Sequence, residues 1–136
     1  MLIDSNILIY AINADSPKNR SAQTFLKENS GNLEIAHQNI FETIRVLTHP
    51  KFSNPMKLDM ALKAVFNITE SSTIISPDQN TYFLALEFIK QNQLSGNRIF
   101  DAYLAATALS NDINTIITDN VLDFKKFKGL KIINPF

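Results

Sequence analysis

The chain has 136 residues, 45% of them hydrophobic and 19% charged, which fits one globular domain with a single core and no bilayer-crossing segment. Lys plus Arg equals Asp plus Glu at 13 each, which excludes a protein that binds nucleic acid through a strong overall positive field. There is no cysteine, which excludes disulfides, thiolate zinc sites and cysteine nucleophiles.

The N-terminal apolar stretch is expected to be part of the fold and not a signal peptide. It contains Asp4 and lacks both a basic segment and a convincing cleavage site. We therefore expect a cytoplasmic protein without a membrane partner. A nucleic acid would have to bind a local group of basic residues. The candidates are Arg45, Lys51 and Lys57, or Lys125, Lys126, Lys128 and Lys131. The alternative is that these are ordinary surface charges.

Short apolar runs alternate with stretches of helical period, and no repeat or Gly/Ser/Pro-rich linker interrupts them. The expected strands are residues 2–3, 33–36, 73–76, 115–118 and 131–133. The expected helices are one that follows Asp4, then residues 16–28, 38–49, 58–70, 77–92 and 100–110. This alternation predicts a single α/β domain over residues 1–136, with a central, mainly parallel sheet flanked by helices.

Several helix ends are marked by capping residues. Ser16 followed by Pro17 is typical of a helix start, and Gly31 is a stop signal. Pro50 ends the helix before it, and Pro77 opens another.

Asp4 and Asp119 each directly follow an expected strand. In open α/β sheets the carboxyl ends of the strands border the ligand crevice. If the two strands are parallel neighbours, the two carboxylates project into one crevice.

Asp101 and Glu42 are acids within expected helices. Asp101 shares a face with the apolar residues Leu104, Ala105 and Ala108, so it is a helix cap, a member of a buried ion pair or a metal ligand. Glu42 lies off the apolar stripe of its helix, which leaves open a simple solvated glutamate. That stripe, expected to be buried, consists of Ile40, Phe41, Ile44 and Leu47.

Four sequence blocks occur in an order that resembles a PIN domain, and most of all the VapC-type toxins of prokaryotic toxin–antitoxin pairs. Each block alone is a weak signal, but together they span nearly the whole chain. They are residues 2–9 (LIDSNILI), residues 40–50 around Glu42, residues 100–108 (FDAYLAATA) and residues 117–124 (ITDNVLDF).

The resemblance implies a parallel sheet flanked by helices, divalent-metal hydrolysis of RNA phosphodiester bonds, a cognate antitoxin and a homodimer. Our hypothesis is a ring of acids that holds Mg²⁺ or Mn²⁺, with some ligands acting through water. The ring consists of Asp4, Glu42, Asp101 and Asp119. Ser5, Asn6 and Thr118 are expected to hydrogen-bond the acids or the phosphate. The fourth block leaves open whether Asp119 or Asp123 is the more important acid.

Two other classes of function compete with this reading. One is a catalytically weak PIN-fold module that binds RNA or protein, against which the presence of all the acids argues. The other is a flavodoxin-like or receiver-like protein, which would have a glycine-rich first loop or a catalytic lysine after a later strand. A two-imidazole ribonuclease is disfavoured because His37 and His49 show no pairing by spacing.

Overall fold

A computed structural model describes residues 1–136 and contains five strands and seven helices. The strands are β1 (Leu2–Ile3), β2 (Glu34–Ala36), β3 (Thr73–Ile75), β4 (Thr115–Ile117) and β5 (Lys131–Ile133). The helices are α1 (Ser5–Ile12), α2 (Asn19–Glu28), α3 (His37–Thr48), α4 (Leu58–Thr69), α5 (Thr81–Asn92), α6 (Arg98–Ser110) and α7 (Val121–Phe124). Every expected element is present, and only the short helix α7 was not predicted. None of the helices has the length and apolarity of a bilayer-crossing segment.

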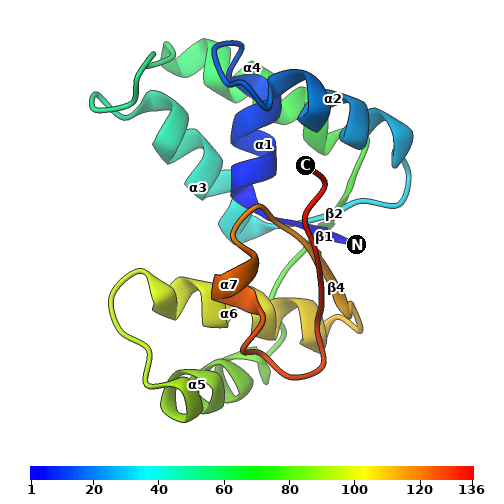
Figure 1. The fold of residues 1–136 in the computed structure, drawn as a ribbon, viewed down its shortest axis with the longest axis vertical. Helices are drawn as coiled ribbons and strands as arrows, with labels where there is room; N and C mark the ends of the chain where they lie inside the picture. The colour runs from blue at the N-terminus through cyan, green and yellow to red at the C-terminus, as the bar shows by residue number, and fades with distance from the viewer.

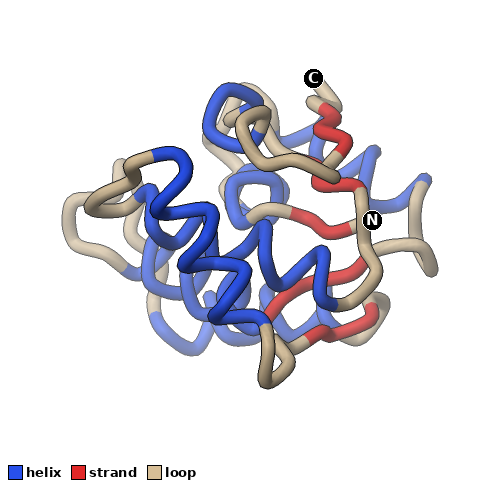
Figure 2. Tube along the Cα trace, turned by 90° about the horizontal axis from the view of Figure 1, so that it is seen from below, coloured by secondary structure: helices blue, strands red, loops and turns tan.

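The five strands form one sheet in the order β3-β2-β1-β4-β5, and every neighbouring pair is parallel. This confirms the predicted parallel α/β architecture, and Figure 2 shows the strands side by side with helices packed against them. Strand β1 is at the centre of the sheet, with β2 and β3 on one side and β4 and β5 on the other. Ligands bind beyond the carboxyl ends of the strands at such a switch point. The ends of β1 and β4 therefore mark the place to look for a site.

Alternate strand residues face opposite sides of the sheet and supply two separate cores. Leu2 and Ile116 belong to the core covered by α5, α6 and α7, whereas Ile3 and Ile117 belong to the core covered by α1 and α2. Helices α3 and α4 pack on each other next to this second core (Figure 1). The two helical layers thus border the ends of β1 and β4 from both sides.

Two helices begin later than expected because a polar side chain first closes a turn. The Ser16 hydroxyl accepts a hydrogen bond from the Lys18 backbone N–H, and α2 starts only at Asn19. Asp78 Oδ1 accepts hydrogen bonds from the backbone N–H groups of Asn80 and Thr81, so α5 starts at Thr81. Such local side-chain bonds compete with the helix for the same backbone donors.

The buried side of α3 differs from the expected apolar stripe. Its fully buried residues are Asn39, Thr43 and Leu47, at i, i+4 and i+8. Phe41 lies on another side of the helix and is 70% exposed, so the prediction that it is buried was wrong. Because Asn39 and Thr43 lie on the buried side of α3, Phe41 faces away from the core.

Candidate active site

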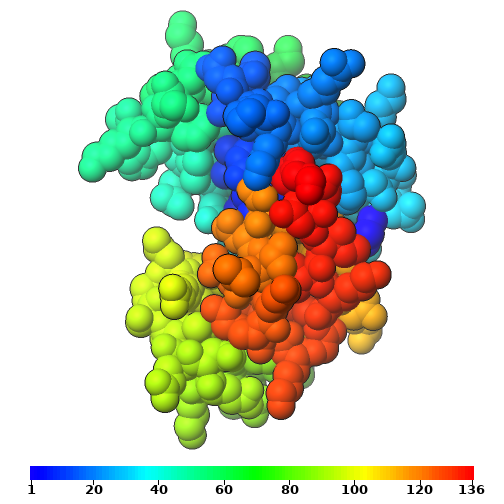
Figure 3. Space-filling model, in the orientation of Figure 1, coloured from blue at the N-terminus to red at the C-terminus, as the bar shows by residue number.

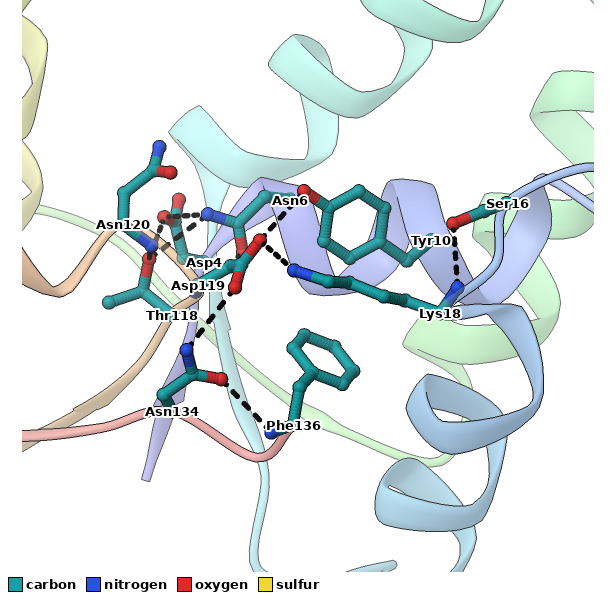
Figure 4. Close-up of polar contacts among 10 residues, drawn as sticks. All are labelled: Asp4, Asn6, Tyr10, Ser16, Lys18, Thr118, Asp119, Asn120, Asn134 and Phe136. Atoms are coloured by element: carbon teal, nitrogen blue, oxygen red, sulfur yellow. Dashed lines mark hydrogen bonds and ion pairs between the residues drawn. The ribbon is translucent and has the colours of Figure 1, made fainter.

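Asp4 lies at the end of β1 and caps the N-terminus of α1. It is only 6% exposed, and both carboxylate oxygens accept hydrogen bonds. Oδ1 accepts from the Ser5 backbone N–H at 2.7 Å and from the Ser5 hydroxyl, while Oδ2 accepts from Thr118 Oγ1 at 2.7 Å and Asn6 Nδ2 at 2.9 Å. Figure 4 shows Asp4, Asn6 and Thr118 gathered at this point. The predicted contacts of Ser5, Asn6 and Thr118 with an acid are thus present.

The pKa of Asp4 is raised to about 6, mainly by burial; the Thr118 hydrogen bond opposes this rise and the nearby negative charge of Glu42 contributes to it. A buried carboxylate keeps its proton more tightly because water no longer stabilises the charge. A cation beside Asp4 would oppose both effects.

A cavity of about 770 Å³ opens between α3 and the start of α6. On the face drawn in Figure 3 the surface is hollowed between these two segments. Three acids line it: Glu42 from α3, Asp101 from α6 and Asp123 from α7. The helices flanking both faces of the sheet therefore bring acids from three distant parts of the sequence to one opening.

Asp101 stands in the first turn of α6 and is partly buried. Its pKa is raised to about 6, mainly by burial and then by the negative charges of Asp123, Asp4 and Glu42, while the positive charge of Lys126 acts in the opposite direction. Each of these acids is close enough to repel the charge on Asp101. The four carboxylates of Asp4, Glu42, Asp101 and Asp123 therefore form one electrostatic group, which we call the acid cluster.

Asp119 follows β4 as expected, but its carboxylate is bound elsewhere. Oδ2 accepts hydrogen bonds from Lys18 Nζ at 2.5 Å and Tyr10 Oη at 3.0 Å, and Oδ1 accepts one from Asn134 Nδ2 at 3.2 Å. These contacts, drawn in Figure 4, hold its pKa below the usual value, with the Lys18 hydrogen bond as the main cause. Asp119 does not line the cavity.

The partners of Asp119 were not predicted, and the sequence had left open whether Asp119 or Asp123 is the more important acid. Lys18 is about a hundred residues away from Asp119 in the sequence. Asn134 lies after β5, the next strand of the sheet. No local sequence pattern therefore links either residue to Asp119. Asp123 reaches the cavity because α7 turns the chain back after β4. A helix of four residues is too short to leave a periodic signal.

The donor set of the acid cluster fits a hard divalent cation such as Mg²⁺ or Mn²⁺, because it offers carboxylate oxygens only. Of the four acids, only Glu42 has an ion-pair partner: Arg45 Nη2 lies 3.9 Å from Glu42 Oε1. No three Asp, Glu or His side chains are close enough together to enclose an ion by themselves. The acids line an open cavity, which suits Mg²⁺ because that ion keeps several of its waters.

The PIN domain family profile matches residues 1–130. The chain is similar to ribonuclease VapC24 of two Mycobacterium tuberculosis strains, with 26% identity over 143 residues, covering 98% of this chain and 94% of the relative.

Two solved structures share the fold. One is VapBC2 from Rickettsia felis bound to a promoter DNA fragment, with a TM-score of 0.75, 22% identity and coverage of 98% and 96% of the two chains. The other is a toxin–antitoxin complex from Klebsiella pneumoniae, with a TM-score of 0.73, 21% identity and coverage of 99% and 97%. With the family profile matching nearly its whole length, this chain belongs to the PIN domain family.

Proposed function

We propose that this protein is a VapC-type ribonuclease toxin that hydrolyses RNA phosphodiester bonds with the help of Mg²⁺ or Mn²⁺. The observation that carries the proposal is the acid cluster: the carboxylates of Glu42, Asp101 and Asp123 line one cavity, and the buried carboxylate of Asp4 is close enough to act electrostatically on Asp101. The curated relative named ribonuclease VapC24 supports it, because that alignment covers nearly all of both chains. An RNA substrate also agrees with a cytoplasmic location.

Asp4 and Asp101 are the proposed direct ligands of the metal, since both are partly withdrawn from water and both have raised pKa values. Glu42 and Asp123 would complete the site, in part through water molecules. Asp123 thus takes the place that the sequence hypothesis gave to Asp119, whose carboxylate is already neutralised by Lys18. When bound, the metal supplies a nucleophile from water near neutral pH and offsets the charge that builds on the phosphate.

Ser5, Asn6 and Thr118 have a positioning role in this proposal. Their donors fix both oxygens of Asp4, so the carboxylate cannot rotate freely when the metal or substrate binds. Asn6 Oδ1 also accepts a hydrogen bond from the Asp119 backbone N–H, which ties the end of β4 to the start of α1. Fixing a ligand's orientation through neighbouring hydrogen bonds strengthens metal binding.

An antitoxin protein and a second copy of the chain are the proposed partners. The exposed apolar side chains on α4 and α5 support this, because a surface of this kind is typical of protein contacts. They are Leu58, Met60, Leu62 and Phe66 on α4, and Tyr82, Phe83 and Leu86 on α5. A related fold has been solved as a toxin–antitoxin complex.

Cleavage of mixed cellular RNA by the purified protein, in Mg²⁺, in Mn²⁺ and in EDTA, tests the proposal. We expect cutting with either metal and none in EDTA. Cutting that continues at the same rate in EDTA would contradict the metal mechanism and favour a metal-free ribonuclease. An unaffected RNA pool under all three conditions would instead favour a module that binds RNA or protein without cleaving.

A further inference from the structure

Two exposed phenylalanines face the same cavity as the acid cluster, one from each wall. Phe41 of α3 is 70% exposed and Phe100 of α6 is 58% exposed, and both line the cavity. Neither belongs to any of the hydrophobic cores. A single exposed aromatic needs no explanation, but two that flank one set of acids form an arrangement that a ligand with flat, apolar faces would fill.

Each phenylalanine has an arginine beside it on the same wall. Arg45 follows Phe41 by one helical turn, so the two side chains lie on one side of α3. Arg98 precedes Phe100 at the start of α6 and also lines the cavity. Arg98 has no ion-pair partner, and the only one near Arg45 is Glu42 at 3.9 Å. Both walls therefore offer a guanidinium and an aromatic ring to a ligand in the cavity.

A hydrogen bond holds the two walls together. Gln38 Nε2, on α3, donates to the backbone carbonyl of Phe100 on α6 at 3.0 Å. The Gln38 side-chain oxygen is buried without a hydrogen-bond partner, and Gln38 itself lines the cavity. This contact fixes the backbone that carries Phe100 relative to the helix that carries Phe41, so the spacing between the two rings is part of the fold.

We infer that Phe41 and Phe100 form an aromatic clamp that stacks on unpaired RNA bases, while Arg45 and Arg98 contact the neighbouring phosphates. The inference rests on the proposed ribonuclease function and assigns the side chains that would hold unpaired RNA on either side of the acids. Stacking on an aromatic ring requires a base whose face is free, which a base inside a duplex does not offer. The acids between the two walls would then face the phosphate that lies between two clamped nucleotides.

Fluorescence anisotropy with a short, unstructured, labelled RNA tests the clamp. The measurement uses the full-length protein with Mg²⁺ and the Asp101→Asn substitution, which prevents cleavage during binding. We expect Phe41→Ala and Phe100→Ala each to weaken binding by about 5- to 100-fold, the range found when one stacked base loses its aromatic partner. Phe41→Trp keeps the flat ring and should retain the affinity.

Phe136→Ala is the matched control, because Phe136 is 40% exposed but lies at the C-terminus and does not line the cavity. It should bind RNA as the parent does. Phe41 and Phe100 are both exposed, so their replacement should leave the thermal unfolding temperature nearly unchanged.

Two further RNAs separate stacking from charge. With an RNA of the same length that carries abasic nucleotides, Phe41→Ala should have no effect, whereas Arg45→Ala and Arg98→Ala should still weaken binding. Each arginine replaced should lower the slope of log affinity against log salt by about 0.7, the value for one phosphate contact with a single strand. A duplex of the same sequence should bind much more weakly than the single strand.

Equal binding by the Phe41→Ala, Phe100→Ala and Phe136→Ala variants would overturn the clamp while leaving the ribonuclease proposal intact. A duplex that binds as tightly as the single strand would do the same. If the parent protein binds no RNA and the wild-type protein cuts none, the proposed function fails and the clamp fails with it.

Discussion

Lys18 Nζ lies 2.5 Å from Asp119 Oδ2, and this ion pair joins the loop before α2 to the end of β4. Asn134 extends the contact to the C-terminal segment through Asp119 Oδ1. The ammonium of Lys18 also lies 4.9 Å from the ring centre of Phe136. Asp119 therefore holds three segments together and, unlike Asp123, does not line the cavity.

Replacement of Asp119 and replacement of Asp123 should have opposite consequences. Asp119→Asn should lower the free energy of unfolding by about 1 kcal/mol, the upper end of the range for a partly exposed ion pair, and leave metal affinity nearly unchanged. Asp123→Asn should reduce Mn²⁺ affinity with little loss of stability. Urea unfolding and calorimetric titration with Mn²⁺ measure the two quantities.

The stabilising effect of Asp119 should also depend on pH. Its pKa is lowered in the folded protein, so its contribution is complete above the ordinary value of 3.8 and is lost as the pH falls further. The difference between wild type and Asp119→Asn should therefore disappear in strong acid. Weaker Mn²⁺ binding by Asp119→Asn at an unchanged stability would return Asp119 to the metal site.

Asp101→Asn should stabilise the metal-free protein at pH 7.5. The pKa of Asp101 is raised from 3.8 to about 6, so the folded state disfavours the ionised form that predominates at neutral pH. Removing the charge should add about 1–3 kcal/mol to the free energy of unfolding, because one pKa unit corresponds to about 1.4 kcal/mol. The gain should be present above pH 6 and vanish below about pH 4. Urea unfolding in EDTA at several pH values measures it, and a destabilised variant at pH 7.5 would contradict the prediction.

Metal affinity should fall steeply as the pH drops below about 6. Asp4 and Asp101 both have pKa values raised to about 6, so protons compete with the cation at these two ligands. Each proton that the metal must displace should weaken binding by about tenfold per pH unit below that point. Calorimetric titration with Mn²⁺ between pH 5 and 8 tests this, and an affinity that stays constant across the range would show that neither acid is a ligand.

Thr118→Val should weaken metal binding without removing any acid. Thr118 is fully buried and donates to Asp4 Oδ2 at 2.7 Å, and its hydroxyl also accepts from Asn6 Nδ2 and from the Asn120 backbone N–H. Valine has nearly the same shape, so the change removes the hydrogen bonds alone. We expect a further rise in the pKa of Asp4 and a loss of about 1–3 kcal/mol in stability, the cost of buried groups left without partners. Thr118→Ser is the control that restores the hydroxyl.

The strands, the parallel sheet and most helices were predictable because their signals are local. A residue such as Asp4 between an apolar strand and an apolar helix can be placed from its neighbours alone. The same holds for Asp101, whose face of α6 contains the buried residues Leu104, Ala105 and Ala108. Where a single segment decides the structure, the sequence analysis was confirmed.

Predictions about which side chains meet were less successful, because these contacts depend on the packing of distant segments. Asp4 and Asp119 follow neighbouring parallel strands, as expected, yet Asp119 turns to Lys18 and not to the acids. Phe41 was assigned to the core from helical period, but the buried Asn39 and Thr43 set the orientation of α3 instead. Periodicity counts polar residues as surface, so it misplaces a helix whose buried face is partly polar.

The acid cluster is proposed to perform metal-dependent RNA cleavage, and the cleavage rate of the Asp101→Asn variant in Mg²⁺ or Mn²⁺ tests this. Its control is Asp59→Asn, which removes an exposed acid from the first turn of α4, away from the cavity. We predict that wild type and Asp59→Asn cut RNA at similar rates, while Asp101→Asn, folded by circular dichroism, loses at least about 100-fold in rate, as expected when a group that stabilises the transition-state charge is removed. A folded Asp101→Asn protein that cuts as fast as wild type would contradict the account.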